Sequence, residues 1–258
     1  MKRILTALAL IPIVVWLVLA AEWWIFFAVL AAIACICWHE YDAIAGSYGF
    51  GKPGIIGYGA GLALLAWNRE LHWLPAVAFT LIVLAVVLRD ENLAHSLPRA
   101  GLLVLGVIYV FGAWKCAIPL RESYGNRHWL MYGLLLNWVG DSGAYFIGRP
   151  FGKHKLAPVV SPKKSWEGSI ASVITSVLIA GFYLVYFIPS VPLWQAAVLT
   201  AVANVAGQLG DLAESAMKRG VNVKDSGTIL PGHGGFLDRV DSTLFALPVI
   251  YAYLLLVG

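Results

Sequence analysis

Nine runs of predominantly apolar residues constrain this chain more than any other feature of its sequence. A helix needs about 20 such residues to cross the hydrocarbon core of a bilayer. The runs cover residues 4–20, 21–38, 54–67, 71–88, 101–120, 129–148, 168–187, 191–210 and 242–257. Because the bilayer interior offers no water to backbone polar groups, such runs cross it as helices. The pattern predicts an all-α, polytopic transmembrane bundle of about nine helices.

The shortage of charged residues supports the same prediction. Only 12% of the 258 residues are charged and 60% are hydrophobic, whereas soluble domains contain about 25% charged residues. The net charge of +4 suits anionic headgroups or phosphate ligands and is too small to indicate nucleic acid binding. Cys35, Cys37 and Cys116 lie inside apolar runs, which favours small apolar packing groups over disulfides or a zinc site.

The distribution of Lys and Arg between the loops predicts the orientation. With the N-terminus inside, fourteen of these residues fall in inner segments and three in outer loops, which fits the positive-inside rule. The first run also has the Lys2–Arg3 start of a signal peptide, with a weak cleavage site at Ala20–Ala21. We expect this run to stay as a helix in a bacterial inner membrane, so that any active site built from the inner loops would face the cytosol.

The inner loop at 211–241 carries an unusual mixture of charges. It holds five of the chain's 14 acidic residues, together with bases and one histidine: Asp211, Glu214, Lys218, Arg219, Lys224, Asp225, His233, Asp238, Arg239 and Asp241. A plain tether between two membrane helices has no use for five carboxylates. Carboxylates that hold Mg²⁺ and bases that hold phosphate oxygens would explain the mixture.

A polar stripe leads into this loop. Asn204, Gln208, Asp211, Ser215 and Lys218 recur at helical spacing, so they share one face of a helix that starts in the membrane and emerges from it. A polar face in hydrocarbon must meet protein or a wet cavity. Hydrogen bonding between helices remains an alternative for Asn204 and Gln208, and a solvated helix end for Asp211 and Lys218.

Asp141 is the strongest single candidate for a functional residue. An ionised carboxylate inside an apolar run is costly and is therefore functional by default. It shares a face with Asn137 and Tyr145. Alternatively, the span ends near Gly140 and Asp141 lies at its boundary. The segment His39-Glu40-Tyr41-Asp42 lacks the second histidine of a zinc motif, and we interpret it as an interfacial helix end.

The inner loop at 149–167 supplies five cations. Ser161-Pro162 is typical of a helix cap followed by proline, which would present Lys163 and Lys164 near the membrane surface. These lysines either clamp a phosphate or only fix topology and attract anionic lipid. In the other loop, the glycines of 231–235, including Gly234 and Gly235, allow backbone N–H groups to approach an anion, although such a segment is more often an ordinary loop. Asp238 and Asp241 open the last helix, as caps or as metal ligands.

The segment from Ser215 to Asp241 resembles the phosphatidate cytidylyltransferase (CDP-diacylglycerol synthase) family. It reads Ser-Ala-Met-Lys-Arg, then Lys224-Asp225, then His233-Gly-Gly-Phe and Asp238-Arg-Val-Asp241. The segments 140–145, 148–153 and 161–168 are also similar to that family, so the likeness covers the C-terminal half. Residues 1–120 match only as a hydrophobic pattern.

The resemblance implies that CTP and phosphatidate react to give CDP-diacylglycerol and pyrophosphate for phospholipid biosynthesis, with Mg²⁺ required as one of one or two metal ions. On this reading Asp211 and Asp238 hold the metal, with Asp141, Asp225 and Asp241 as further ligands or their supports. Lys218, Arg219, Lys224 and Arg239 would hold the triphosphate, and Lys163 and Lys164 the lipid phosphate. His233 would donate a hydrogen bond, and Ser215, Gly234 and Gly235 would contact substrate.

The same reading divides the chain into N-terminal transmembrane helices (1–120) and a C-terminal catalytic region (121–258). Small-residue faces such as Gly57, Gly59 and Gly61 could pack helices within one chain or between two copies in a homodimer. Two rival functions remain. A CTP-dependent lipid kinase would release CDP, and an ion-coupled transporter would use Asp141 in its path, although no paired halves are visible.

Overall fold

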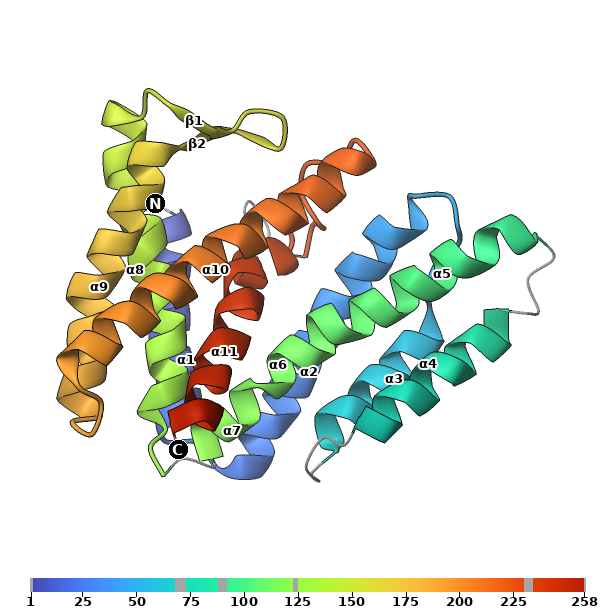
Figure 1. Ribbon diagram of the computed structural model, residues 1–258, viewed down its shortest axis with the longest axis horizontal. Coiled ribbons are helices and arrows are strands. Elements are labelled where there is room, and N and C mark those ends of the chain that lie inside the picture. The colour runs from blue at the N-terminus through green and yellow to red at the C-terminus, as the bar shows by residue number, and fades with distance from the viewer. Residues whose placement is uncertain (1, 68–72, 88–91, 123–124, 230–233, 258) are drawn as a thin grey trace.

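The computed structural model describes residues 2–67, 73–87, 92–122, 125–229 and 234–257. Helices dominate the described residues, and each of the nine predicted apolar runs coincides with a helical segment (Figure 1). These segments are α1 (Lys2–Leu19), α2 (Trp23–Gly46), α3 (Ile55–Ala66), α4 (Trp73–Val87), the stretch from α5 to α7, α8 (His128–Phe151), α9 (Trp166–Phe187), α10 (Leu193–Gly220) and α11 (Leu237–Val257). The all-α prediction is therefore confirmed.

Within the described residues, five helical stretches are long and apolar enough to cross a membrane. They are Trp23–Gly46, Leu93–Glu122, Trp166–Phe187, Leu193–Gly220 and Leu237–Val257. The second comprises α5 (Leu93–Gly106), a π-helical turn η1 (Val107–Gly112), α6 (Ala113–Lys115) and α7 (Ala117–Glu122). The number of nine spans and the orientation remain predictions.

A short β-hairpin joins α8 to α9 and corrects one expectation from the sequence. Strand β1 (Lys155–Ala157) pairs antiparallel with β2 (Ser161–Ser165). Ser161 and Pro162 therefore lie in a strand, and the helix cap expected there was placed too early. The Ser165 side chain is the true cap of α9, where it accepts a hydrogen bond of 3.2 Å from the Gly168 N–H. Pairing with β1 holds 161–165 extended, so the helix starts four residues later than its proline suggested.

Helices α8, α9, α10 and α11 pack together in one group, and α3, α4 and α5 lie on the other side of α2 and α11 (Figure 1). Glycines allow α8 and α9 to approach closely. A Cβ on Gly148 would lie 3.1 Å from the Gly168 Cα, and one on Gly143 would lie 2.1 Å from Thr175 Oγ1. This contact ties the hairpin end of α8 to the start of α9.

The small-residue face of α3 packs mostly within the chain. A Cβ on Gly57 would lie 1.7 Å from the Trp38 ring and one on Gly61 would lie 2.0 Å from the Phe111 ring, whereas Gly59 faces open space. Two of the three glycines therefore accommodate intramolecular packing. A homodimer stays a prediction, and so does the division at residue 120.

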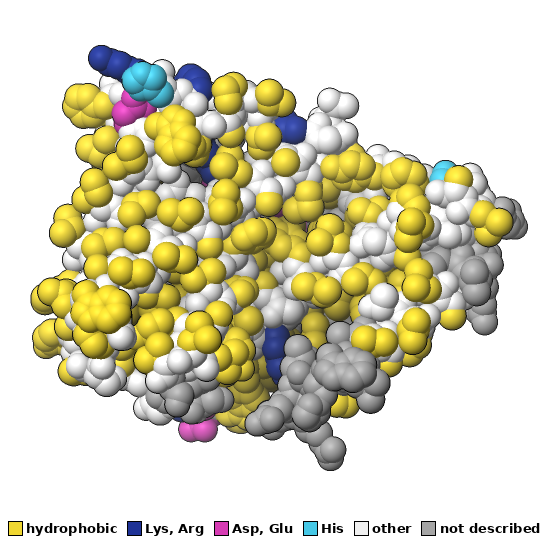
Figure 2. Space-filling model, viewed as in Figure 1, with side chains coloured by type: hydrophobic (Ala, Val, Ile, Leu, Met, Phe, Trp, Pro, Cys, Tyr) yellow, Lys and Arg dark blue, Asp and Glu magenta, His cyan; other side chains and the backbone are white. Residues whose placement is uncertain are grey.

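The start of α1 and the hairpin lie at one end of the molecule, and the C-terminus lies at the opposite end (Figure 1). The face in Figure 2 is mostly hydrophobic, while Lys, Arg and His side chains gather over the hairpin. Large apolar side chains such as Leu178 and Phe182 are more than half exposed. An apolar surface with most of its visible charges at one end (Figure 2) is the surface expected of a protein whose solvent is lipid.

Candidate functional site

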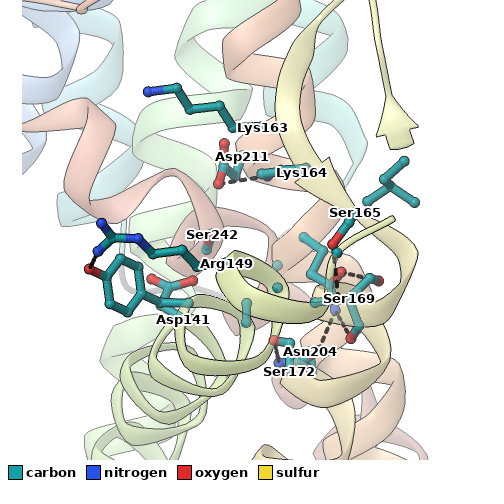
Figure 3. Close-up of a pocket in the computed structure, with 18 of the residues that line it drawn as sticks. Asp141, Arg149, Lys163, Lys164, Ser165, Ser169, Ser172, Asn204, Asp211 and Ser242 are labelled. Atoms are coloured by element: carbon teal, nitrogen blue, oxygen red, sulfur yellow. Dashed lines mark hydrogen bonds and ion pairs between the residues drawn. The ribbon is translucent and has the colours of Figure 1, made fainter. Parts of the chain in front are cut away.

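A polar cavity of about 670 Å³ opens at the hairpin end of the bundle (Figure 3). Its walls come from α8, α9, α10, the hairpin and the first turns of α11. The polar and charged residues that line it are Asn137, Asp141, Tyr145, Arg149, Lys155, Lys163, Lys164, Ser165, Ser169, Ser172, Asn204, Gln208, Asp211 and Ser242. Such a volume is ample for a small-molecule ligand.

Two carboxylates enter the cavity from different helices. Asp141 lies in the middle of α8, is exposed to the cavity, and interacts electrostatically with Asp211 of α10. Helix α8 continues to Phe151, so Asp141 does not lie at a helix end, and a membrane span that ends near Gly140 remains an alternative. Asn137 and Tyr145 line the same cavity, which confirms the predicted polar face of α8.

Cations surround this acidic pair. Lys164 Nζ lies 2.7 Å from Asp211 Oδ2 (Figure 3). Arg149 donates a 2.5 Å hydrogen bond to the Tyr145 hydroxyl and lies over the Tyr145 ring. Lys163 is exposed at the edge of the cavity. A site that offers both carboxylates and cations can hold a metal ion and phosphate oxygens at the same time.

The predicted polar stripe forms one face of α10, and its first part, Asn204 to Asp211, lines the cavity. Asn204 Nδ2 donates to Ser172 Oγ (3.0 Å) and Ser176 Oγ (2.9 Å) of α9, and Gln208 Nε2 donates to Asn204 Oδ1 (2.7 Å). Hydrogen bonding between helices, the alternative left open for these two residues, is therefore present. Asn204 and Gln208 also lie in the cavity wall, so both readings hold.

Farther along α10, the stripe enters a second group of residues that we call the Lys218 cluster: Glu214, Lys218, Ser226 and Asp238. Lys218 Nζ contacts Asp238 Oδ1 and lies 2.7 Å from Glu214 Oε2. Asp238 Oδ2 accepts hydrogen bonds from the backbone N–H groups of Ser226 (3.0 Å) and Gly235 (2.9 Å). Both oxygens of Asp238 therefore have protein donors.

Three further predicted residues lie between these two groups. Asp241 is buried and interacts electrostatically with both Asp211 and Glu214. Arg239 is exposed and interacts with Asp141. Asp225 lies beside Asp238, since a Cβ on Gly234 would meet oxygens of both residues, at 3.3 and 3.1 Å.

A model of the family described as "Cytidylyltransferase family" matches residues 1–257. The chain belongs to the cytidylyltransferase family. Three similar relatives are named phosphatidate cytidylyltransferase. The protein of Staphylococcus saprophyticus is 36% identical over 185 residues, which cover 72% of this chain and 70% of the relative. Those of Staphylococcus haemolyticus and Staphylococcus aureus strain COL are 38% identical over 188 and 185 residues, 71% of this chain and 70% of each relative.

The family resemblance of the sequence is thus confirmed. In the structure of this cytidylyltransferase, most of the predicted site residues lie in the cavity, in the Lys218 cluster or on the exposed surface. Asp141, Lys163, Lys164 and Asp211 line the cavity, and the Ser215 hydroxyl donates to Asp211 at 3.4 Å. Lys218 and Asp238 meet in the cluster. Arg219 is exposed and donates to the Val223 carbonyl, and Lys224 is exposed. His233 lies outside the described residues.

Gly235 has a structural reason to lack a side chain. A Cβ there would lie 1.9 Å from Ser226 Oγ and 2.6 Å from Glu40 Oε2. Gly234 adopts a φ of 80°, a region that favours glycine. These two glycines therefore permit a tight turn and close packing, and their predicted contact with substrate stays a prediction.

Four charged residues near the site received no individual role from the sequence: Arg149, Lys155 and Glu214 were only counted among the loop charges, and Glu40 was only part of the expected helix end at 39–42. Glu40 is 2% exposed and accepts hydrogen bonds from the segment 226–237. The interpretation of 39–42 as an interfacial helix end fits the end of α2 at Gly46 but misses this burial. Helix α2 extends to Gly46, so Glu40 lies within the helix rather than at its last residue, and only the structure shows its partners.

The donor set of the cavity fits a magnesium ion shared with a substrate. Among the residues that the structure describes, no three His, Cys, Asp or Glu side chains converge as a ready-made cage. Mg²⁺ is usually bound by one or two carboxylates together with waters and substrate phosphates. Asp141 and Asp211 supply two interacting carboxylates in one cavity, which is the protein's share of such a site.

Proposed function

We propose that this chain is a CDP-diacylglycerol synthase, which transfers the cytidylyl group of CTP to phosphatidate and releases pyrophosphate. Membership of the cytidylyltransferase family and the names of its relatives support the reaction. The observation that carries the assignment to a site is the polar cavity, in which Asp141 and Asp211 face cations at the charged end of an apolar bundle. One substrate is a lipid and the other is a charged nucleotide, and such a position is accessible to both.

The reaction is an in-line displacement at phosphorus. A phosphate oxygen of phosphatidate forms a bond to the α-phosphorus of CTP, and the bond from that phosphorus to the bridging β-phosphate oxygen breaks. Since the phosphate nucleophile is already largely ionised near neutral pH, no strong general base is needed. Positioning and neutralisation of charge then account for most of the rate.

The positions of the cations suggest which of them bind the lipid phosphate and which bind the triphosphate. Lys163 and Lys164 lie on the hairpin and Arg149 on the last turns of α8. The same turns of α8 carry the exposed apolar side chains of Phe146 and Phe151. We assign these cations to the lipid phosphate. Arg239, which approaches Asp141 from α11, is assigned to the triphosphate together with the exposed Arg219 and Lys224.

Mg²⁺ fits the carboxylates of Asp211 and Asp141, and when bound it would neutralise the phosphate oxygens and the leaving pyrophosphate. Lys164 is paired with Asp211 at 2.7 Å. We propose that this lysine holds the Asp211 carboxylate in place and turns to the lipid phosphate when substrate enters.

Asp238 was also expected to bind the metal, and a titration can test this. Both its oxygens accept hydrogen bonds from protein groups. If Asp238 is a metal ligand, Asp238→Asn should raise the Mg²⁺ concentration needed for half-maximal activity. If it only holds the loop, Asp238→Asn should lower the Tm and leave that concentration unchanged.

For the membrane arrangement, we propose nine spans with the N-terminus and the cavity in the cytosol of a bacterial inner membrane. The excess of Lys and Arg in the segments predicted to be inside supports this orientation. Helix α10 has 28 residues and is therefore about 42 Å long, longer than the roughly 30 Å of a hydrocarbon core. Its last turns, which carry Asp211 to Lys218, would then reach the cytosolic interface.

The test is turnover of CTP labelled with ³²P at the α-phosphate, with phosphatidate in detergent micelles and with or without Mg²⁺. Label that enters the lipid phase only with Mg²⁺ is the expected result. A CTP-dependent lipid kinase would leave this label in CDP and would instead transfer label from the γ-phosphate. Label that stays in CTP would reject both enzymes.

A further inference from the structure

The carboxylate of Glu40 lies at the junction between the N-terminal helices and the segment that carries Asp238. It stands on the last turns of α2 and is 2% exposed. Oε2 accepts hydrogen bonds from Ser226 Oγ (2.8 Å) and the Leu237 N–H (2.7 Å), and Oε1 accepts one from the Phe236 N–H (2.9 Å). One side chain thus binds both ends of the segment 226–237.

Two of these donors belong to the start of α11. Leu237 is the first residue of this helix and Phe236 precedes it. The first N–H groups of a helix have no partner within the helix and favour a negative charge. Glu40 therefore serves as a cap supplied by another helix, and its direction of approach fixes where α11 begins.

The first turns of α11 carry groups that belong to the proposed site. Asp238, Arg239 and Asp241 follow Leu237 directly, and the next residue, Ser242, lines the cavity. Ser226, which donates to Glu40 through its hydroxyl, also donates to Asp238 through its backbone N–H. A shift of the Glu40 carboxylate would therefore move both the loop and the start of α11.

Two glycines in the surrounding backbone leave the space that the Glu40 carboxylate occupies. A Cβ on Gly227 would lie 2.5 Å from Glu40 Oε1, and a Cβ on Gly235 would lie 2.6 Å from Oε2. Both distances are below any real contact. Glycine at both positions is the packing counterpart of a carboxylate at position 40.

We propose that Glu40 is a positioning residue for the cytidylyl transfer, which sets the place of α11 and its charged first turn without contacting substrate. The inference rests on the proposed function. On this proposal the N-terminal helices do more than anchor the chain in the membrane, because a residue of α2 positions the helix that carries Asp238.

The test compares Glu40→Gln with a matched control, Asp42→Asn. Asp42 is a buried carboxylate on the same helix, and its Oδ1 accepts a 2.6 Å hydrogen bond from the Gly54 N–H, at the start of α3 rather than α11. In Glu40→Gln, an amide NH₂ replaces one acceptor oxygen and faces an N–H or O–H donor, so one of the three hydrogen bonds is lost.

We expect kcat of Glu40→Gln to fall about 100-fold, the effect of a misplacement of about 1 Å. The KM values for CTP and phosphatidate should change less than about threefold, because ground-state contacts remain. Asp42→Asn should retain kcat. Amide hydrogen exchange at Phe236 and Leu237 should accelerate only in Glu40→Gln. A kcat of Glu40→Gln within about threefold of that of Asp42→Asn, or unchanged exchange at 236–237, would overturn the proposal.

A second variant tests the same proposal if the Glu40→Gln protein does not fold. Ser226→Ala removes one donor to Glu40 and should lower kcat about tenfold, a loss of one hydrogen bond to a charged group; wild-type kcat in this variant would contradict the proposal. The exchange measurement needs no turnover. A wild-type chain without cytidylyl transfer would therefore refute the proposed function, while unchanged exchange in the variant would refute the role of Glu40.

Discussion

The cavity and the Lys218 cluster lie on successive turns of α10, but their charged side chains differ in exposure. In the cavity, the side chains of Lys164 and Asp211 are 26% and 33% exposed. In the cluster, those of Lys218 and Asp238 are 8% and 10% exposed, and Glu214 is fully buried. The carboxylate of Asp211 has room for a ligand, whereas that of Asp238 is surrounded by protein donors.

The difference indicates that the charged residues on one helix, α10, and their partners perform two tasks. Groups that face the cavity are free to exchange partners, which a binding site needs. Groups in the cluster hold the loop and α11 together, which keeps the cavity in shape. Substitutions in the cavity should therefore change activity, and substitutions in the cluster should also change stability.

The largest effect is expected for Asp211→Ala. Loss of this carboxylate removes a proposed metal ligand, and the rate of CDP-diacylglycerol formation should fall at least about 1,000-fold, at the upper end for a lost electrostatic contact. The Tm in detergent should change little, because a partly exposed ion pair contributes at most about 1 kcal/mol. Retained turnover would remove Asp211 from the site.

Lys218→Met should have the largest effect on stability. It leaves Glu214 and Asp238 as buried carboxylates without their cation, at a cost of about 3 kcal/mol. Lys164→Met is the matched control, for which we expect less than about 1 kcal/mol. Thermal unfolding of both variants in the same detergent gives the comparison. Equal Tm values would show that the two groups do not differ in the way described.

Gly235→Ala sharpens the account of the tight turn. The new methyl group would overlap Ser226 Oγ and Glu40 Oε2, and overpacking of this kind costs about 1–3 kcal/mol. We expect a lower Tm. Gly59→Ala is the control, because nothing lies within 4 Å of a Cβ there. A Tm of Gly235→Ala equal to that of the control would contradict the predicted overlap.

The smallest effect is expected for Lys163→Ala at the exposed edge of the cavity. If Lys163 attracts the lipid phosphate, the KM for phosphatidate should rise about tenfold, as for one charge-assisted contact. The KM for CTP should stay constant. Steady-state kinetics with each substrate varied in turn separates the two, and a rise in the KM for CTP alone would reassign this lysine.

The sequence predicted the helices well, because the length and polarity of a membrane span are local properties. It also predicted which face of α10 is polar and that Asp141 shares a polar face. It did not predict that Lys218 turns away from the cavity, since burial in the cluster depends on the fold of 226–238. The hairpin was missed because Ser161-Pro162 suits a helix start equally well. Glu40 was missed because its partners lie almost 200 residues away along the chain.

The most direct test of the central claim asks whether the cavity is where the substrates bind. Ala144→Cys places a thiol in the cavity wall, and Val159→Cys places one at the exposed tip of the hairpin. The wild-type chain corrects for its three cysteines. We predict that CTP and phosphatidate together slow maleimide labelling at position 144 and leave position 159 unaffected. Equal labelling rates at position 144 with and without saturating substrates would contradict the account.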